Sequence, residues 1–346
     1  MPKKKETKEV VEKSKASVLD IALKAINKKH GAAIRWLDDV PKENISYIST
    51  GSMSLDSALG GHGFPRGRVV EIFGWESCGK STLAMSTAAE ANKLGLNCLY
   101  IDAERALDPR LPVSYGVDPK KFILEDAALP AETHLDILES AVSSGDVGMV
   151  VVDSVTALTP KAILEGSYGD TTIGLQARLL SQSLSKLIHL IGETNTLLIF
   201  INQFREKINM YGGDPKTTSG GNAIRFYATH RVEIAGSGKT KSDRILGSDG
   251  NIVGHRMKFK VVKNKLGVPF RSGGIDLIYG KGYDTTSELV ELAVDFGIID
   301  VAGSWYSFGE ENRFQGKDGF KKFVAENGEA RNTIAQKVNF VLSSII

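Results

Sequence analysis

Gly74-Trp75-Glu76-Ser77-Cys78-Gly79-Lys80-Ser81 is the stretch of sequence that decides the fold of this chain. It fits the phosphate-binding loop pattern G-x-x-x-x-G-K-[ST], whose glycines let backbone N–H groups wrap around a polyphosphate. In this pattern the lysine reaches the β- and γ-phosphates, and the hydroxyl that follows can ligate Mg²⁺. Residues 69–73 predict a strand that enters the loop, and residues 82–93 predict a helix that leaves it. Such a helix directs its positive N-terminal end at the phosphates.

The composition is typical of a globular protein with a sizeable core. The chain has 346 residues, of which 42% are hydrophobic, enough for one large domain and one or two small ones. A net charge of only +2 means that any nucleic-acid-binding surface must be local. Two cysteines, Cys78 and Cys98, cannot form a disulfide framework, and a cysteine in a phosphate loop suits a reducing compartment. With neither an apolar signal region nor a run of about 20 apolar residues, we expect a cytoplasmic protein without a membrane partner.

A short amphipathic helix is predicted over residues 17–29. Leu19, Ala22 and Ile26 form one apolar stripe along it. Because so short a helix is marginal in water, we expect this face to dock on its own domain or on a neighbouring subunit.

Strands and helices alternate through the middle of the chain. The apolar strands cover residues 97–101, 149–152 and 197–201, and the helices cover 133–143 and 180–191. This pattern predicts a mostly parallel sheet covered on both faces, in which ligands bind beyond the carboxyl ends of the strands. Glu104, Asp153 and Gln203 follow the three strands, so we expect them at the same sheet edge as the phosphate loop.

These polar residues suggest nucleotide hydrolysis. Asp153 would hold Mg²⁺ directly or through water, a weak inference alone and a strong one beside the phosphate loop. Glu104 is a candidate for orienting or deprotonating the attacking water. An exposed ion pair of Glu104 with Arg105 or Arg110 is the alternative.

Two long loops follow. Residues 204–222 mix cations, apolar side chains and glycines, and loops this long are uncommon unless functional or disordered. Cations that meet phosphates, and apolar groups that meet base faces, would suit a single nucleic-acid strand. Residues 165–174 form a second glycine-containing loop, followed by Arg178. Ordinary active-site lids are the alternative for both loops.

The later sequence changes character. Residues 256–261 and 275–279 alternate apolar and polar side chains, which predicts an antiparallel extension of the sheet. From about Thr285 a helix, an aromatic hairpin around Trp305 and two terminal helices predict a small separate domain.

The chain resembles the bacterial RecA recombinase family over nearly its whole length. Besides the phosphate loop, the resemblance is carried by Ile101–Glu104, Ala106–Pro109, Val151–Ser154, Leu197–Gln203, Thr217–Thr218, Gly220–Ala223, Lys260–Lys265 and Trp305–Tyr306. It implies an α/β fold: a RecA-type P-loop NTPase core with a mostly parallel central sheet, an N-terminal docking helix and a small α+β C-terminal domain. The implied domains are a polymerisation helix and linker (1–42), an ATPase core with DNA-binding loops (43–284) and a duplex-DNA-binding domain (285–346).

The resemblance implies an ATP-dependent DNA recombinase of recombinational repair. Such a protein is a DNA-dependent ATPase that uses ATP and Mg²⁺, forms a helical filament on single-stranded DNA and exchanges strands with double-stranded DNA. The implied partners are further copies of the chain, single-strand-binding protein, loaders and a LexA-like repressor that cleaves itself in the SOS response. A helicase-like ring ATPase and a small-molecule kinase are alternatives, although the long mixed loop argues against a kinase.

The resemblance also implies roles for single residues. The nucleotide would contact Gly74, Glu76, Ser77, Cys78, Gly79, Lys80, Ser81, Thr82, Asp108, Asp153 and Tyr279, with Ser81 and Asp153 toward the metal. The implied catalytic residues are Glu104, Lys80, Gln203 and, reaching a neighbouring subunit's γ-phosphate, Lys263 and Lys265. DNA would contact Ile173, Arg178, Arg205, Lys207, Met210, Tyr211, Thr217, Gly220, Gly221 and Asn222. Leu19, Ala22, Ile26 and Phe226 would form subunit contacts, and Lys317, Lys321 and Lys322 would face duplex DNA.

Several residues depart from the family pattern. Trp75 stands where the family usually has proline, and Leu111 stands where many members place a tyrosine against adenine. Ile173 replaces an unbranched apolar wedge, and no acidic tail precedes Ile346. These differences indicate a divergent member, from a phage or an unusual bacterium.

Overall fold

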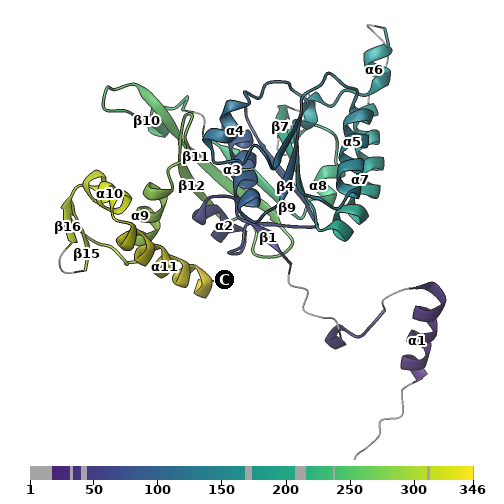
Figure 1. Cartoon of the computed structure of the whole chain (residues 1–346), viewed down its shortest axis with the longest axis horizontal. Coiled ribbons are helices and arrows are strands. Elements are labelled where there is room, and N and C mark those ends of the chain that lie inside the picture. The colour runs from purple at the N-terminus through teal and green to yellow at the C-terminus, as the bar shows by residue number, and fades with distance from the viewer. Residues whose placement is uncertain are drawn as a thin grey trace, which may run out of the picture. The chain divides into compact units, whose positions relative to one another are not determined.

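The computed structural model describes residues 18–31, 34–39, 45–167, 174–206, 216–236, 238–309 and 312–345. These residues belong to two compact units, Met1–Ile45 and Ser46–Ile346, and each unit is described here by itself (Figure 1).

The first unit contains the amphipathic helix that the sequence predicts. It comprises α1 (Val18–His30) and the 3-10 helix η1 (Leu37–Asp39). Trp36 Nε1 donates to Asp20 Oδ1 at 2.9 Å, and the Asn27 side chain bonds both backbone groups of Ile34. The chain after α1 therefore folds back along the helix. Helix α1 buries none of its residues, and Leu19 and Ile26 of the predicted stripe are exposed.

An 11-stranded sheet forms the centre of the second unit, in the order β13-β12-β11-β9-β3-β7-β6-β4-β5, with β10 on β11 and β8 on β7. The parallel strands are β3 (Val69–Gly74), β4 (Asn97–Asp102), β5 (Phe122–Glu125), β6 (Val147–Asp153), β7 (Leu197–Glu206) and β9 (His230–Ala235). The antiparallel strands are β8 (Lys216–Thr218), β10 (Arg244–Leu246), β11 (Ile252–Asn264), β12 (Ser272–Ile278) and β13 (Gly282–Tyr283). The predicted parallel sheet with an antiparallel extension is confirmed.

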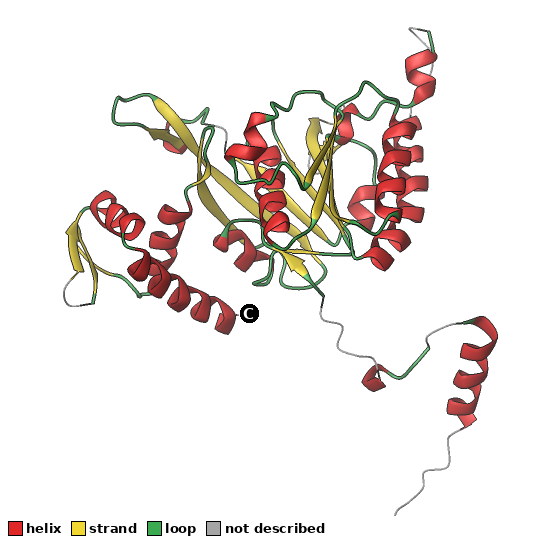
Figure 2. Cartoon of the chain, viewed as in Figure 1, coloured by secondary structure: helices red, strands yellow, loops and turns green. Residues whose placement is uncertain are grey.

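Helices cover both faces of this sheet (Figure 2). The helices between residues 46 and 284 are α2 (Met53–Leu59), α3 (Lys80–Lys93), α4 (Arg110–Ser114), α5 (Ala131–Ser143), α6 (Lys161–Glu165), α7 (Leu175–Thr194) and α8 (Ala223–Tyr227), with 3-10 helices η2 (Val155–Ala157) and η3 (Lys241–Asp243). A small ribbon of β1 (Tyr47–Ile48) and β2 (Phe64–Pro65) is also present. Successive side chains of β6 point to opposite faces of the sheet and so divide the core in two. Val151 packs in the apolar cluster with α2 and α3, and Val152 packs in the cluster with α5 and α7.

The register of the parallel strands brings the predicted site residues to one edge. Gly74 pairs with Gln203 across β3 and β7, and Asp102 pairs with Asp153 across β4 and β6. Since β6 pairs with β7 so that Val152 lies opposite Phe200, Asp153 ends β6 two residues short of Gln203. All four residues therefore lie near the edge where α/β proteins bind ligands.

The C-terminal residues have a core of their own. Helix α9 (Thr285–Asp295) precedes an antiparallel sheet of β14 (Asp300–Ala302), β15 (Trp305–Phe308) and β16 (Asn312–Gln315), and α10 (Lys317–Glu326) and α11 (Gly328–Ile345) follow. Phe320, Val324 and Ile334 are fully buried between these elements. The predicted aromatic hairpin and the two terminal helices are confirmed.

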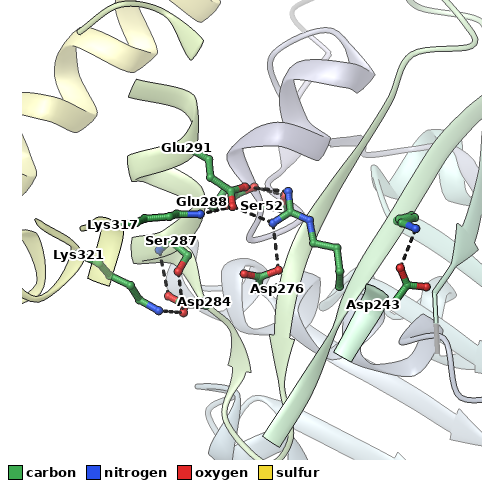
Figure 3. Close-up of polar contacts among 11 residues, drawn as sticks. Ser52, Asp243, Asp276, Asp284, Ser287, Glu288, Glu291, Lys317 and Lys321 are labelled. Atoms are coloured by element: carbon green, nitrogen blue, oxygen red, sulfur yellow. Dashed lines mark hydrogen bonds and ion pairs between the residues drawn. The ribbon is translucent and has the colours of Figure 1, made fainter. Parts of the chain in front are cut away.

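Polar contacts join this C-terminal part to helix α2 and also hold α10 against α9 (Figure 3). The carboxylate of Glu288 is buried and accepts hydrogen bonds from Ser52 Oγ at 2.5 Å and Ser54 N at 3.0 Å. Lys317 pairs with Glu291 at 2.6 Å, and Lys321 pairs with Asp284. Lys317 and Lys321, which the resemblance assigns to duplex DNA, are therefore already paired with carboxylates of their own chain.

Candidate active site and nucleic-acid interface

Backbone packing explains the glycines of the phosphate loop. A Cβ atom on Gly74 would lie 2.1 Å from the carbonyl oxygen of Ile234 on the neighbouring strand. Gly79 has φ +98°, a conformation that side chains disfavour, and a Cβ there would lie 2.9 Å from Met257 Sδ. Helix α3 begins at Lys80, directly after Gly79 and two residues before the start that the sequence predicts.

Lys80 lies folded within its own loop. Its ammonium Nζ donates to the carbonyl oxygen of Trp75 at 2.6 Å, and only 8% of the residue is exposed. Cys78 Sγ donates to the same oxygen at 2.9 Å, and burial raises the pKa of this thiol. The thiol is therefore a neutral filler of the loop at physiological pH.

Asp153 lies in contact with the hydroxyl that the phosphate-loop pattern assigns to a metal. Its Oδ2 accepts hydrogen bonds from Ser81 Oγ and from Tyr100 OH, both at 2.6 Å. Burial raises the pKa of Asp153, against the effect of these bonds, and the nearby Glu104 adds to the rise. A carboxylate and a hydroxyl together suit Mg²⁺, which prefers oxygen ligands and takes few of them from protein. Tyr100 was not predicted, because nothing in an apolar strand marks which tyrosine ends beside a carboxylate.

Glu104 is held by residues from two other strand ends. Its Oε1 accepts hydrogen bonds from Ser154 Oγ and from Gln203 Nε2, the latter at 3.1 Å. Arg110, one of the alternative ion-pair partners for Glu104, instead pairs with Asp108 at 2.5 Å. Glu104 and Gln203 are thus brought together as predicted, whereas the part played by Ser154 was missed.

A cavity of about 400 Å³ opens beside the phosphate loop. Its lining consists of Ser77, Cys78, Gly79, Lys80, Ser81, Thr82, Leu111, Tyr115, His255, Leu277, Tyr279 and Gly280. Tyr279 and Leu111, which the resemblance places near the base, therefore line the same cavity as the phosphate loop. The structure adds Tyr115, His255 and Leu277 to this lining. Asp108 lies outside this lining, and Arg110 holds the pKa of its carboxyl at about 2.

The predicted DNA-binding residues divide into two groups. Ile173, Lys207, Met210 and Tyr211 lie outside the described residues. Arg178 and Arg205 are exposed, Asn222 is exposed before α8, and Thr217 lies half-buried on β8. Arg205 Nε donates to Ser219 Oγ at 3.3 Å.

Gly220 and Gly221 pack closely against neighbouring side chains. A Cβ on Gly220 would lie 2.7 Å from Leu180 Cδ1, and one on Gly221 would lie 2.7 Å from Ala177 Cβ. Both glycines also line a cavity of about 450 Å³ with Thr156, Gln176 and Gly174. The glycines therefore let the chain after β8 approach α7, beside the C-terminal ends of both predicted loops.

The residues predicted to face another subunit are only partly free to do so. Phe226 is 72% exposed and Lys265 is exposed. Lys263 Nζ donates to the carbonyl oxygens of Arg225 and Phe226, at 2.6 and 3.1 Å. Burial, followed by the nearby Lys265 and Arg231, lowers the pKa of Lys263.

The described part of the chain contains neither a metal-binding cluster of side chains nor a membrane-spanning helix. No group of three or more His, Cys, Asp or Glu side chains there could hold a metal ion by itself. No helix there is long and apolar enough to cross a membrane.

Comparison with known proteins identifies the family. The family model for the RecA N-terminal domain matches residues 17–284, and that for the RecA C-terminal domain matches residues 287–342. The chain belongs to the RecA family. It is 44% identical to Protein RecA of Lactiplantibacillus plantarum over 326 residues, which cover 94% of this chain and 84% of that protein. It is also 44% identical to Protein RecA of Chlorobaculum parvum over 337 residues, or 96% of this chain and 95% of that protein. As a RecA-family member, it is a recombinase that acts in DNA recombination and repair.

Proposed function

We propose that this RecA-family chain hydrolyses ATP to ADP and phosphate in response to DNA, as a helical filament on single-stranded DNA. In this proposal residues 43–284 form the ATPase core, residues 1–42 carry the polymerisation helix, and residues 285–346 bind duplex DNA. The observation that carries it is the contact between Glu104 and Gln203, which joins the candidate catalytic base to the residue that precedes the second DNA loop.

The proposed site binds the triphosphate between α3 and the strand ends. Lys80 would exchange the Trp75 carbonyl for the charged oxygens of the β- and γ-phosphates, which are stronger acceptors. Ser81 and Asp153 would hold Mg²⁺, which when bound neutralises charge on the phosphate oxygens. Leu111, Tyr115 and Tyr279 offer apolar surfaces to the base.

Glu104 would orient the attacking water and accept its proton. Ser154 and Gln203 hold one carboxylate oxygen of Glu104 in place, which leaves the other oxygen, Oε2, for the water. If Gln203 turns toward a γ-phosphate it must release Glu104, so nucleotide state and the DNA loop after Gln203 are linked through one side chain. Lys263 and Lys265 would reach the γ-phosphate of a neighbouring subunit and complete the site only in the filament.

Nucleic acid would lie along the two loops. Arg178 and Arg205 would meet phosphates of single-stranded DNA, and the glycines at 220–221 would allow close backbone approach. Leu19, Ala22, Ile26 and Phe226 would join successive subunits. Single-strand-binding protein, loaders and a LexA-like repressor are further proposed partners.

ATP hydrolysis, measured with and without single-stranded DNA over a range of protein concentrations, tests this proposal. We expect strong stimulation by DNA that rises cooperatively with protein concentration, because the trans lysines are supplied only in the assembly. A hydrolysis rate per subunit that changes neither with DNA nor with protein concentration would refute an ATP site that is shared between subunits and activated by DNA.

A further inference from the structure

A row of aromatic rings connects the phosphate loop to the root of the second DNA loop. The Trp75 and Phe204 rings lie 5.3 Å apart between centroids, and Phe204 meets Phe73 edge-on at 5.4 Å. The guanidinium of Arg231 lies 4.5 Å from the centre of the Phe73 ring. We call these residues, Trp75, Phe204, Phe73 and Arg231, the aromatic ladder. Phe204 directly follows Gln203, so the ladder touches the DNA loop where that loop begins.

The inner end of the ladder is buried and fixed. Arg231 Nε donates to Glu71 Oε2 at 2.5 Å, and Glu71 is fully buried. Asn202 Nδ2 donates to the other oxygen of Glu71 and to the carbonyl of Ser219, each at 3.0 Å. These bonds hold β3, β7 and the chain after β8 together. The outer end is different, because Trp75 is 43% exposed and stands on a loop.

The outer end also contacts the nucleotide-binding lysine. The carbonyl oxygen of Trp75 accepts the hydrogen bond from Lys80 Nζ at 2.6 Å. Phosphate oxygens compete for this ammonium because hydrogen bonds between two charged groups are stronger than those to a neutral carbonyl. Nucleotide binding therefore changes the bonding of the Trp75 peptide, while the ring of the same residue rests on Phe204.

We propose that Trp75 is a positioning residue that transmits nucleotide binding to the DNA loop through Phe204, in parallel with Gln203. The proposal rests on the function proposed above, since it concerns how ATP and single-stranded DNA affect each other at that site. It predicts that the Trp75–Phe204 contact carries part of the coupling between the two ligands.

A double-mutant cycle tests the contact. The variants are Trp75→Leu, Phe204→Leu and both together, with Trp305→Leu as a matched control that removes a partly exposed tryptophan of the C-terminal part. The measured quantity is the ratio of single-stranded DNA affinities with and without a non-hydrolysable ATP analogue. We expect each ladder variant to lower this ratio at least about fivefold, the low end of typical couplings. The affinity ratio of the double variant should be no lower than that of either single variant, and Trp305→Leu should keep the wild-type ratio.

Reciprocity separates coupling from mere damage. By linkage, DNA must raise the protein's affinity for the analogue by the same factor as the analogue raises its affinity for DNA. The ratio of analogue affinities with and without DNA should therefore fall in the ladder variants by as much as the ratio of DNA affinities. A fluorescence readout is available because the chain has three tryptophans. In a Trp36→Phe, Trp305→Phe background, Trp75 emission should respond to the analogue, and Phe204→Leu should abolish its response to DNA.

The outcomes are distinguishable. If the wild-type ratio is one, the proposed function fails. If the wild-type protein couples the ligands and Trp75→Leu couples them equally well, or if the two substitutions act additively, only the inference about the ladder is overturned.

Discussion

Glu104 lies two residues beyond the end of β4, with one carboxylate oxygen bonded to Ser154 and Gln203. Glu104→Gln keeps the size of the side chain and one acceptor oxygen but removes the charge that a base needs. We expect DNA-stimulated ATP turnover to fall by about 10²–10⁴-fold, the usual range for a general base. Nucleotide affinity should be retained, which equilibrium binding of ATP would measure.

A control for this substitution is Glu193→Gln, which removes an exposed carboxylate near the end of α7. It should leave turnover unchanged. Full activity in Glu104→Gln would exclude Glu104 as the base.

His230, at the start of β9, gives a second prediction for a single residue. It is fully buried, and burial lowers its pKa to about 4, with Asn264 opposing the shift. In the unfolded chain a histidine has a pKa near 6.5, so between about pH 4 and 6.5 the unfolded state binds more protons. The free energy of unfolding should therefore rise with pH across this window, by about 3 kcal/mol at most from this group.

Denaturant unfolding at several pH values would measure this dependence. His230→Gln cannot titrate, so the pH slope of its unfolding free energy should be smaller than in the wild type. His189→Gln, which alters an exposed histidine on α7, should keep the wild-type slope. An identical slope in His230→Gln and the wild type would contradict the assigned pKa.

Among the elements, β7 and β8 are the strands on either side of the loop for which we propose DNA binding. Arg205 pairs with Thr217 across these strands, and its side chain is exposed. If Arg205 meets a DNA phosphate, Arg205→Ala should weaken binding of single-stranded DNA uniformly across sequences. It should also reduce the slope of log affinity against log salt by about one.

Binding isotherms over a range of salt concentrations would measure both quantities. Lys186→Ala removes one exposed positive charge from α7 and is the matched control, with no expected change in slope. Unaltered affinity and slope in Arg205→Ala would mean that this residue makes no phosphate contact.

Elements and strand ends could be predicted from the sequence because their signals are local. An apolar run followed by a polar residue is a pattern that spans only a few consecutive residues. This pattern located Glu104, Asp153 and Gln203. Ser154 and Tyr100 were missed, because their roles depend on which distant strands become neighbours. The same limit applies to Lys317 and Lys321, whose carboxylate partners lie 26 and 37 residues away in the chain.

At the scale of the whole molecule, one buried carboxylate joins the C-terminal part to helix α2 (Figure 3). Ser52 caps the N-terminus of α2 by accepting from Leu55 N, and Glu288 of α9 accepts from Ser52 Oγ and Ser54 N. The helix that precedes the phosphate-loop strand is thus capped in part by a residue more than two hundred positions later. Burial raises the pKa of Glu288, against these hydrogen bonds. Removing this acceptor would leave buried donors of α2 without a partner.

Glu288→Ala should therefore lower the free energy of unfolding by about 1–3 kcal/mol, the usual effect of leaving a buried polar group unsatisfied. Glu326→Ala, which removes an exposed carboxylate of the same part, 3.9 Å from Lys322, should change it by less than about 0.5 kcal/mol. Denaturant unfolding followed by circular dichroism would measure both. Because the Glu288 side chain on α9 bonds Ser52 and Ser54 across the junction, its loss should also separate the transition of the C-terminal part from that of the sheet. A single transition of wild-type midpoint would show that the junction depends on its apolar and ionic contacts instead.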